Sequence, residues 1–322
     1  MSNHSAKDPH RSKIIADIVL LGQLMRRSFT ELKKNDPLRM AGATAFFTTF
    51  ALPPILFIIL QIFGLFMDRG EFAAKIMGRL SEVLGNDSVV LIRQTLRNAG
   101  GLDINWFATF LGFAFLIFIA TTLFVVIKNS LDQIWCIGVR SDVNIWFRLK
   151  QRLFSFGIIM FAGLLFTSGL AIEAARTFLG GYFTSLKPSA STISNSILNE
   201  IIFALIITIW FAVLFRFVTD GRPRWKNALV GGFFTAILFT AGKLTIRYFL
   251  ALSNIQIIYS TSAAMVLLLL FVFYAALIFY YGGCFVKILS DHNKEPIHPV
   301  EGAYKFKVQE IVTERGKKEG QP

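Results

Sequence analysis

The sequence predicts an all-α membrane protein: a polytopic bundle of six transmembrane helices. Of its 322 residues, 54% are hydrophobic, 34 are Phe and only 16% are charged, a composition typical of an integral membrane protein. From Tyr248 to Val286 the chain contains no Asp, Glu, Lys or Arg, although about 20 apolar residues are enough to cross a bilayer. The predicted segments on the side of the two termini carry 24 Lys and Arg, against 7 on the other side, which places both termini in the cytoplasm.

The formal net charge of +13 invites a nucleic-acid interpretation. The cations are instead dispersed over the short connections on one side of the membrane, as the positive-inside rule requires, and do not form one continuous footprint. We therefore expect membrane lipids as partners, with a small solute as a further candidate, and no nucleic acid.

Residues 1–40 form the first predicted unit, a cytoplasmic tail followed by an amphipathic helix. The apolar positions of this helix recur at helical spacing, and its other face is basic (Ile14, Ile18, Leu21, Met25 and Leu32, against Lys13, Arg26, Arg27, Lys33 and Lys34). A basic amphipathic helix ahead of a span is typical of the membrane interface. Packing on the protein's own cytoplasmic loops is an equal alternative.

The second unit, residues 41–290, is the six-helix transmembrane domain. Its first span, Ala41–Phe66, contains Pro53 and Pro54, which together remove two backbone donors and predict a helix break or kink. Broken helices occur at transporter sites, whereas a purely structural kink is the more common case. Short external helices are expected between spans 1 and 2, within residues 67–103. The later spans are Trp106–Val126, Leu153–Ile172, Ile197–Val218, Asn227–Leu250 and Ser260–Leu289.

The fifth span carries the most informative pattern. Small side chains recur every four residues and predict a stripe for close helix packing (Ala228, Gly232, Ala236 and Thr240). Lys243 and Arg247 fall inside the arc of this stripe, although charges in an apolar helix are costly unless paired or hydrated. We expect Glu173, Arg176 and Glu200 at a comparable, outer-leaflet depth, where the five could form a charge cluster around a solute. The alternative is that Lys243 and Arg247 extend to the outer interface and the acids only mark helix ends.

The sequence offers no pattern for an enzyme. The four histidines all lie in the tails (His4, His10, His292 and His298), and no HExxH, GxSxG, P-loop or GxGxxG occurs. We therefore expect no catalytic residue, metal or cofactor, and Cys136 and Cys284 are expected to be free thiols. The third unit, residues 291–322, is predicted as a polar cytoplasmic tail that is mobile.

Several segments in order resemble the YihY/BrkB family of membrane proteins. Ala41–Pro54 (AGATAFFTTFALPP) is similar to its first span, and Leu131–Leu153 to its loop after the second span. Leu214–Leu289 is similar to its most characteristic region, with RW at Arg224-Trp225 and GK at Gly242-Lys243. This chain departs from the family where Gly282-Gly283-Cys284 stands in place of GAE, so that it lacks that acidic residue.

The resemblance implies a six-helix protein of the bacterial inner membrane, linked by its family name to virulence and serum resistance. It also carries an older ribonuclease label, which the lack of clustered metal ligands in the sequence opposes. Two functions remain open: a permease for a small anionic or lipid-like solute, and a non-transporting scaffold or lipid-organising protein of the envelope. A continuous polar path to Lys243 would favour the permease, and a bundle sealed by Phe and Leu at that level would favour the envelope protein.

Overall fold

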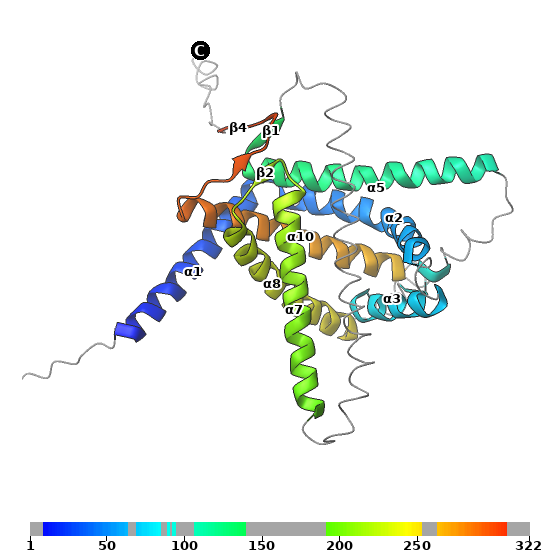
Figure 1. Cartoon of the computed structure of the whole chain (residues 1–322), viewed down its shortest axis with the longest axis horizontal. Helices are drawn as coiled ribbons and strands as arrows, with labels where there is room; N and C mark the ends of the chain where they lie inside the picture. Colours follow the sequence, from blue (N-terminus) through cyan, green and yellow to red (C-terminus); the bar gives the residue numbers. More distant parts are fainter. Residues whose placement is uncertain are drawn as a thin grey trace, which may run out of the picture.

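A computed structural model describes residues 9–63, 69–84, 89–90, 92–94, 106–139, 191–252 and 263–307. Within these ranges the chain is mostly helical, as predicted (Figure 1). The longer elements are α1 (Pro9–Lys34), α2 (Pro37–Phe63), α3 (Arg69–Leu84), α5 (Trp106–Trp135), α7 (Ser191–Phe217), α8 (Trp225–Leu252) and α10 (Ala263–His292). The same ranges contain four short strands: β1 (Ile137–Val139), β2 (Gly221–Arg222), β3 (His298–Pro299) and β4 (Ala303–Lys305).

Helix α10 is the central element of the bundle. It packs against α1, α2, α3, α5 and α8, and α8 in turn packs against α7 (Figure 1). Within the described ranges, Met265–His292 in α10 is the one helix that is long and apolar enough to cross a membrane. The helices α2, α5, α7 and α8 overlap the first, second, fourth and fifth predicted spans. The third predicted span, Leu153–Ile172, lies outside the described residues.

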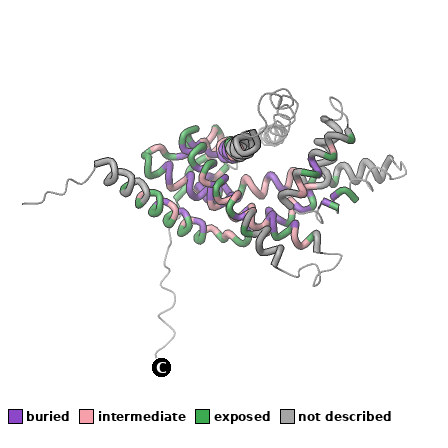
Figure 2. Tube along the Cα trace, turned by 90° about the horizontal axis from the view of Figure 1, so that it is seen from below, coloured by how far each residue is buried: buried purple, intermediate pink, exposed green. Residues whose placement is uncertain are grey.

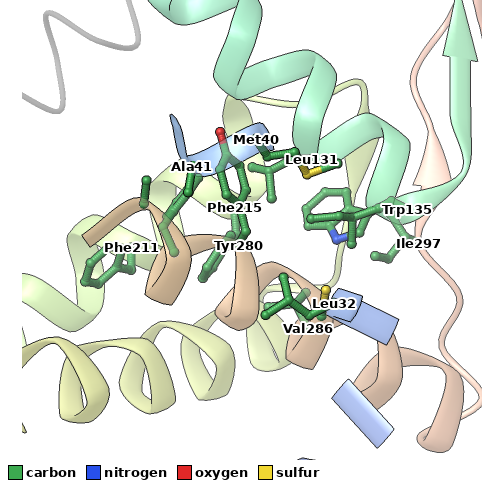
Figure 3. Close-up of a cluster of buried hydrophobic side chains, with 14 of the residues drawn as sticks. Leu32, Met40, Ala41, Leu131, Trp135, Phe211, Phe215, Tyr280, Val286 and Ile297 are labelled. Atoms are coloured by element: carbon green, nitrogen blue, oxygen red, sulfur yellow. The ribbon is translucent and has the colours of Figure 1, made fainter. Parts of the chain in front are cut away.

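The main hydrophobic core lies where the ends of several helices meet. Its side chains come from α1, α2, α5, α7, α10 and the segment before β3 (Figure 3). Two polar contacts inside it join α10 to its neighbours: the Trp135 indole Nε1 donates to the Gly283 carbonyl at 2.9 Å, and the hydroxyl groups of Thr44 and Tyr280 are 2.5 Å apart. Both contacts give buried polar groups hydrogen-bond partners across helices.

The amphipathic helix α1 packs on the protein itself along its C-terminal half. Leu24 packs against Phe285 and Leu289 of α10, and the Lys287 ammonium contacts a Glu31 carboxylate oxygen at 2.6 Å. The partner of this half of α1 is therefore α10, and the location of the helix at the membrane interface stays a prediction. Three apolar side chains of the same helix, Val19, Leu21 and Phe29, are exposed, and Figure 2 colours several positions of α1 as exposed.

The segment after α10 is ordered, and the expectation of a mobile tail from residue 291 is wrong as far as Lys305. Strand β3 pairs antiparallel with β2, and β4 pairs antiparallel with β1. The backbone N–H of Val300 also donates to the Asp220 carbonyl at 2.8 Å. The strands β1 and β2, which follow α5 and α7, provide backbone partners for this segment. Pairing satisfies backbone N–H and C=O groups that would otherwise bond to water.

The proline pair in α2 does not end the helix. α2 continues through Pro53 and Pro54 to Phe63. The side chains of both prolines lie outside the described part of the structure, so a kink there stays a prediction. The proline pair in the first predicted span therefore does not interrupt α2.

Candidate functional site

A buried charge cluster lies at the end of α5, beyond the predicted second span. The Lys128 ammonium donates to the Asp132 carboxylate at 2.9 Å and also to the carboxylate of Asp220, in the turn after α7. The other Asp132 oxygen accepts the backbone N–H of Asp220 at 3.0 Å. The three side chains are only 12%, 8% and 3% exposed, so this cluster fixes the α7–α8 turn to α5 in a setting that water hardly reaches.

The cluster perturbs the acid–base properties of its members. Burial raises the pKa of Asp132 to about 6, although Lys128 opposes that rise. Burial alone would lower the pKa of Lys128, but the attraction of Asp132 and Asp220 outweighs it and raises that pKa. Two carboxylates share one ammonium, so the cluster is formally anionic when all three groups are charged.

A second polar group joins the start of α8 to the end of α10. The buried Asn227 side-chain amide donates to the hydroxyl of Ser290 at 3.2 Å and to a Glu295 carboxylate oxygen at 3.3 Å. Its oxygen accepts from the Asn293 side chain at 2.8 Å. The other oxygen of Glu295 accepts from the guanidinium of Arg224. Together these contacts hold the end of α10 and the loop after it against the start of α8 and the turn before it.

Next to these contacts an open pocket of about 400 Å³ is lined by Arg216, Arg224, Trp225, Lys226 and Glu295, and we call it the basic pocket. The Arg216 guanidinium lies over the Trp225 ring, 4.8 Å from its centroid, and donates to the Pro223 carbonyl. Arg222 in turn donates to the carbonyl of Arg216, at the end of α7. The basic pocket thus presents three cations, Arg216, Arg224 and Lys226, beside the exposed indole of Trp225.

An aromatic layer fills the space between α7, α8 and α10. It consists of five phenylalanines: Phe211 and Phe215 from α7, Phe239 from α8, and Phe271 and Phe279 from α10. The rings of Phe215 and Phe279 stack at 5.1 Å between centroids, and Phe211 lies 6.0 Å from Phe239 and 6.1 Å from Phe279. Phe239 continues the layer to Phe271 at 6.1 Å.

Gly232, one residue of the predicted packing stripe of α8, lies against α7. A Cβ at Gly232 would lie 2.5 Å from the Thr208 carbonyl and 2.9 Å from the Ala212 nitrogen, so only glycine permits this approach. Ala228 and Ala236 are buried, and Thr240 is half-buried.

A second set of glycines, which sequence reasoning missed, lies between α8 and α10. A Cβ at Gly231 would overlap Val286, one at Gly242 would overlap Tyr274, and one at Gly282 would overlap Thr235. These contacts show that the two helices run antiparallel in one register along their length. Period-four spacing marked the first set, whereas this set has no regular spacing in the sequence.

The structure describes only part of the predicted charge cluster. Lys243 is half-buried in α8, beside Gly242 and the Tyr274 hydroxyl that lies on it. Glu173 and Arg176 lie outside the described residues, and so do the side chains of Arg247 and Glu200. The hypothesis of a five-residue cluster therefore remains a prediction. Within the described ranges no group of three or more His, Cys, Asp and Glu is placed to hold a metal ion.

Sequence reasoning missed the buried cluster of Lys128, Asp132 and Asp220. One signal was present, because Lys128 and Asp132 are four residues apart on a predicted helix and so share a face. Asp220 lies 92 positions from Lys128, and nothing local in the sequence connects them. The cations of the α7–α8 turn served in the sequence analysis only to predict topology. The pocket that they line depends on the fold.

Apolar helices, exposed apolar faces and a charged end to the bundle define the class: an integral membrane protein built from helices. The chain belongs to the virulence factor BrkB family, whose model matches residues 28–302. The resemblance inferred from the sequence is thus confirmed.

Curated relatives are bacterial proteins named UPF0761 membrane protein. The chain is 25% identical to one from Ralstonia nicotianae over 251 residues, 76% of this chain and 54% of the relative. It is 25% identical to one from Methylibium petroleiphilum over 216 residues (66% and 48%) and 26% identical to one from Pseudomonas aeruginosa over 251 residues (75% and 56%). The chain spans about half the length of these relatives. No solved structure matches it.

Proposed function

We propose that this chain is a six-span protein of the bacterial inner membrane, with both termini cytoplasmic, that organises lipids in support of the envelope. It does so without conducting a solute between α7, α8 and α10. The aromatic layer carries this proposal, because it occupies the interface that holds the half-buried Lys243.

The register of α8 against α10 locates the layer relative to Lys243. Thr235 lies beside Gly282 and Gly242 beside Tyr274, so Lys243 is level with Tyr274. Phe239 lies one turn before Lys243 on α8, and Phe271 lies about one turn beyond its level on α10. Each well-packed aromatic pair contributes about 0.5–1.5 kcal/mol beyond its buried area, so opening a path here would break several such contacts. This supports a sealed interface.

The N-terminal helix supports a role at the lipid surface. Lys287 pairs with Glu31, and the Tyr281 hydroxyl donates to the Met25 carbonyl at 3.0 Å, so the C-terminal half of α1 is fixed to α10. Val19 and Leu21 of the same helix remain exposed. A basic helix with exposed apolar side chains is suited to the headgroup region of a membrane.

A permease for a small anionic or lipid-like solute is the second candidate. Lys243 favours it, because a cation in an apolar helix commonly marks a solute path. In that case the unplaced residues Glu173, Arg176, Glu200 and Arg247 would complete the site around it. The two candidates differ in whether function needs the ammonium group of Lys243.

Complementation of a gene deletion tests the proposal. A strain without the gene should take up more of a hydrophobic dye, and the wild-type gene should restore the barrier. Lys243→Met should restore it equally, as should Thr245→Val, a control on the exposed surface of α8. Failure of Lys243→Met alone, with normal amounts of protein in the membrane, would contradict the proposal and favour the permease.

A further inference from the structure

The basic pocket carries more positive charge than its own structure needs. Arg216, Arg224 and Lys226 face one carboxylate, that of Glu295. Glu295 pairs with Arg224 and also accepts from Asn227, so both of its oxygens are already engaged. The lining keeps a formal excess of two positive charges on an open surface, which suits an anion with several acceptor oxygens.

A smaller pocket of about 190 Å³ adjoins it and shares Arg224 and Glu295. Lys294, Pro296 and His298 complete its lining. The two hollows therefore form one continuous cationic surface along the α7–α8 turn and the loop after α10. The Arg216 guanidinium, held over the Trp225 ring and bonded to the Pro223 carbonyl, is already oriented, so binding would order it little further.

An exposed apolar stripe begins at this pocket and continues along α8. Trp225, Leu229, Phe233 and Ile237 recur every four residues and are 46%, 41%, 55% and 52% exposed. At 1.5 Å per residue the stripe is about 18 Å long. One leaflet contributes about 15 Å of hydrocarbon, so the stripe matches the depth of a single leaflet.

We propose that the basic pocket binds the phosphate of an anionic phospholipid in the cytoplasmic leaflet, with one acyl chain along the stripe from Trp225 to Ile237. This assignment rests on the proposed function for its orientation. A cationic site with an indole at the water interface and an apolar surface leading away from it is complementary to both parts of such a lipid. A free phosphate would use the pocket and leave the stripe without a role.

The test uses the full chain in detergent micelles. Its melting temperature is measured against increasing phosphatidylglycerol, against phosphatidylcholine with the same acyl chains, and against inorganic phosphate or glycerol phosphate. A ligand that binds only the folded protein raises its stability, so half-saturation gives an apparent affinity. Phosphatidylglycerol should stabilise the protein, while phosphatidylcholine and the two soluble phosphates should have much weaker effects.

Two double variants make the test specific. Arg224→Gln with Lys226→Gln should raise the half-saturating amount of phosphatidylglycerol at least tenfold. Lys305→Gln with Lys307→Gln removes two exposed cations outside the pocket and should change it less than twofold. Phe233→Ala should weaken binding of the lipid without changing any response to soluble phosphate. Raising salt from about 0.1 M to about 1 M shortens the Debye length from about 10 Å to about 3 Å and should weaken binding of the lipid to wild type.

Three results would overturn the assignment. Equal stabilisation by phosphatidylcholine would remove headgroup selectivity, and a full response to inorganic phosphate would replace the lipid with a soluble anion. An unchanged response in the Arg224 and Lys226 variant would place any lipid site elsewhere. If lipid binds as predicted while Lys243→Met fails to restore the barrier in cells, the pocket stands and the sealed-bundle function does not.

Discussion

Replacing Lys128 with Met removes the only cation of the buried cluster and keeps most of the aliphatic stem. Lys128 is 12% exposed and contacts both Asp132 and Asp220, which are 8% and 3% exposed. The variant removes the ammonium that both carboxylates contact, and leaves only the more distant attraction of the Arg222 guanidinium. Removing one partner of a buried ion pair costs about 3–5 kcal/mol, because the remaining charge has lost its compensation. We expect the free energy of unfolding to fall by that amount near pH 8.

The pH dependence of this loss tests its cause. Burial has already raised the pKa of Asp132 to about 6 with Lys128 present, so removing the ammonium raises it further. As pH falls toward about 5, the Asp132 carboxylate takes up a proton and its uncompensated charge disappears. The deficit of Lys128→Met should therefore shrink by about half or more between pH 8 and pH 5.

The assay is denaturant unfolding of the detergent-purified chain, followed by circular dichroism. Arg39→Gln serves as the control, since Arg39 and Asp36 form an exposed pair at 3.8 Å with 65% and 74% exposed side chains. An exposed pair of this kind contributes about 0–1 kcal/mol. If Lys128→Met destabilised the protein no more than Arg39→Gln does, or by the same amount at both pH values, the buried cluster would not fix the α7–α8 turn.

Three further predictions use the same unfolding assay. Gly232→Val should cost about 1–3 kcal/mol through overlap with Thr208 on α7, whereas Phe233→Ala, on the exposed side, should be nearly neutral. Tyr280→Phe should cost about 1 kcal/mol, because the Thr44 hydroxyl keeps its bond to the Met40 carbonyl; a change below 0.3 kcal/mol, roughly the assay's resolution, would contradict it. Asp132 should lower wild-type stability by about 2 kcal/mol as pH rises from about 4 to about 6, because its pKa is raised from 3.8 to about 6; the wild-type minus Asp132→Asn difference isolates this slope, and a flat difference would refute it.

The helices could be predicted from the sequence because their signals are local. Apolar runs of bilayer length predicted α10 and the helices over four other expected spans, and the family resemblance rested on motifs in order. The period-four stripe found the glycine contact of α8 with α7. Each of these features depends on residues close together in the chain.

The polar end of the bundle could not be predicted, because it is built from residues distant in sequence. Asp220 reaches Lys128 across 92 positions, and β4 pairs with β1 only after α10 has crossed the bundle. Cys136, with a φ of 57°, turns the chain from α5 into β1, although nothing in its residue type announces a left-handed conformation. The polar composition after residue 291 predicted a mobile tail. Pairing of this segment with β1 and β2, the strands that follow α5 and α7, overrides that prediction.

Anion flux through the purified protein is the direct test of whether the interface of α7, α8 and α10 is sealed. The full chain is reconstituted in liposomes of phosphatidylglycerol and phosphatidylethanolamine, and efflux of trapped chloride, phosphate and a small organic anion is measured. If the interface of α7, α8 and α10 is sealed, efflux equals that of protein-free liposomes, and Phe279→Ala shows whether thinning the aromatic layer creates a leak. Wild-type efflux well above the protein-free rate and abolished by Lys243→Met would contradict it, and would establish a solute path beside α8.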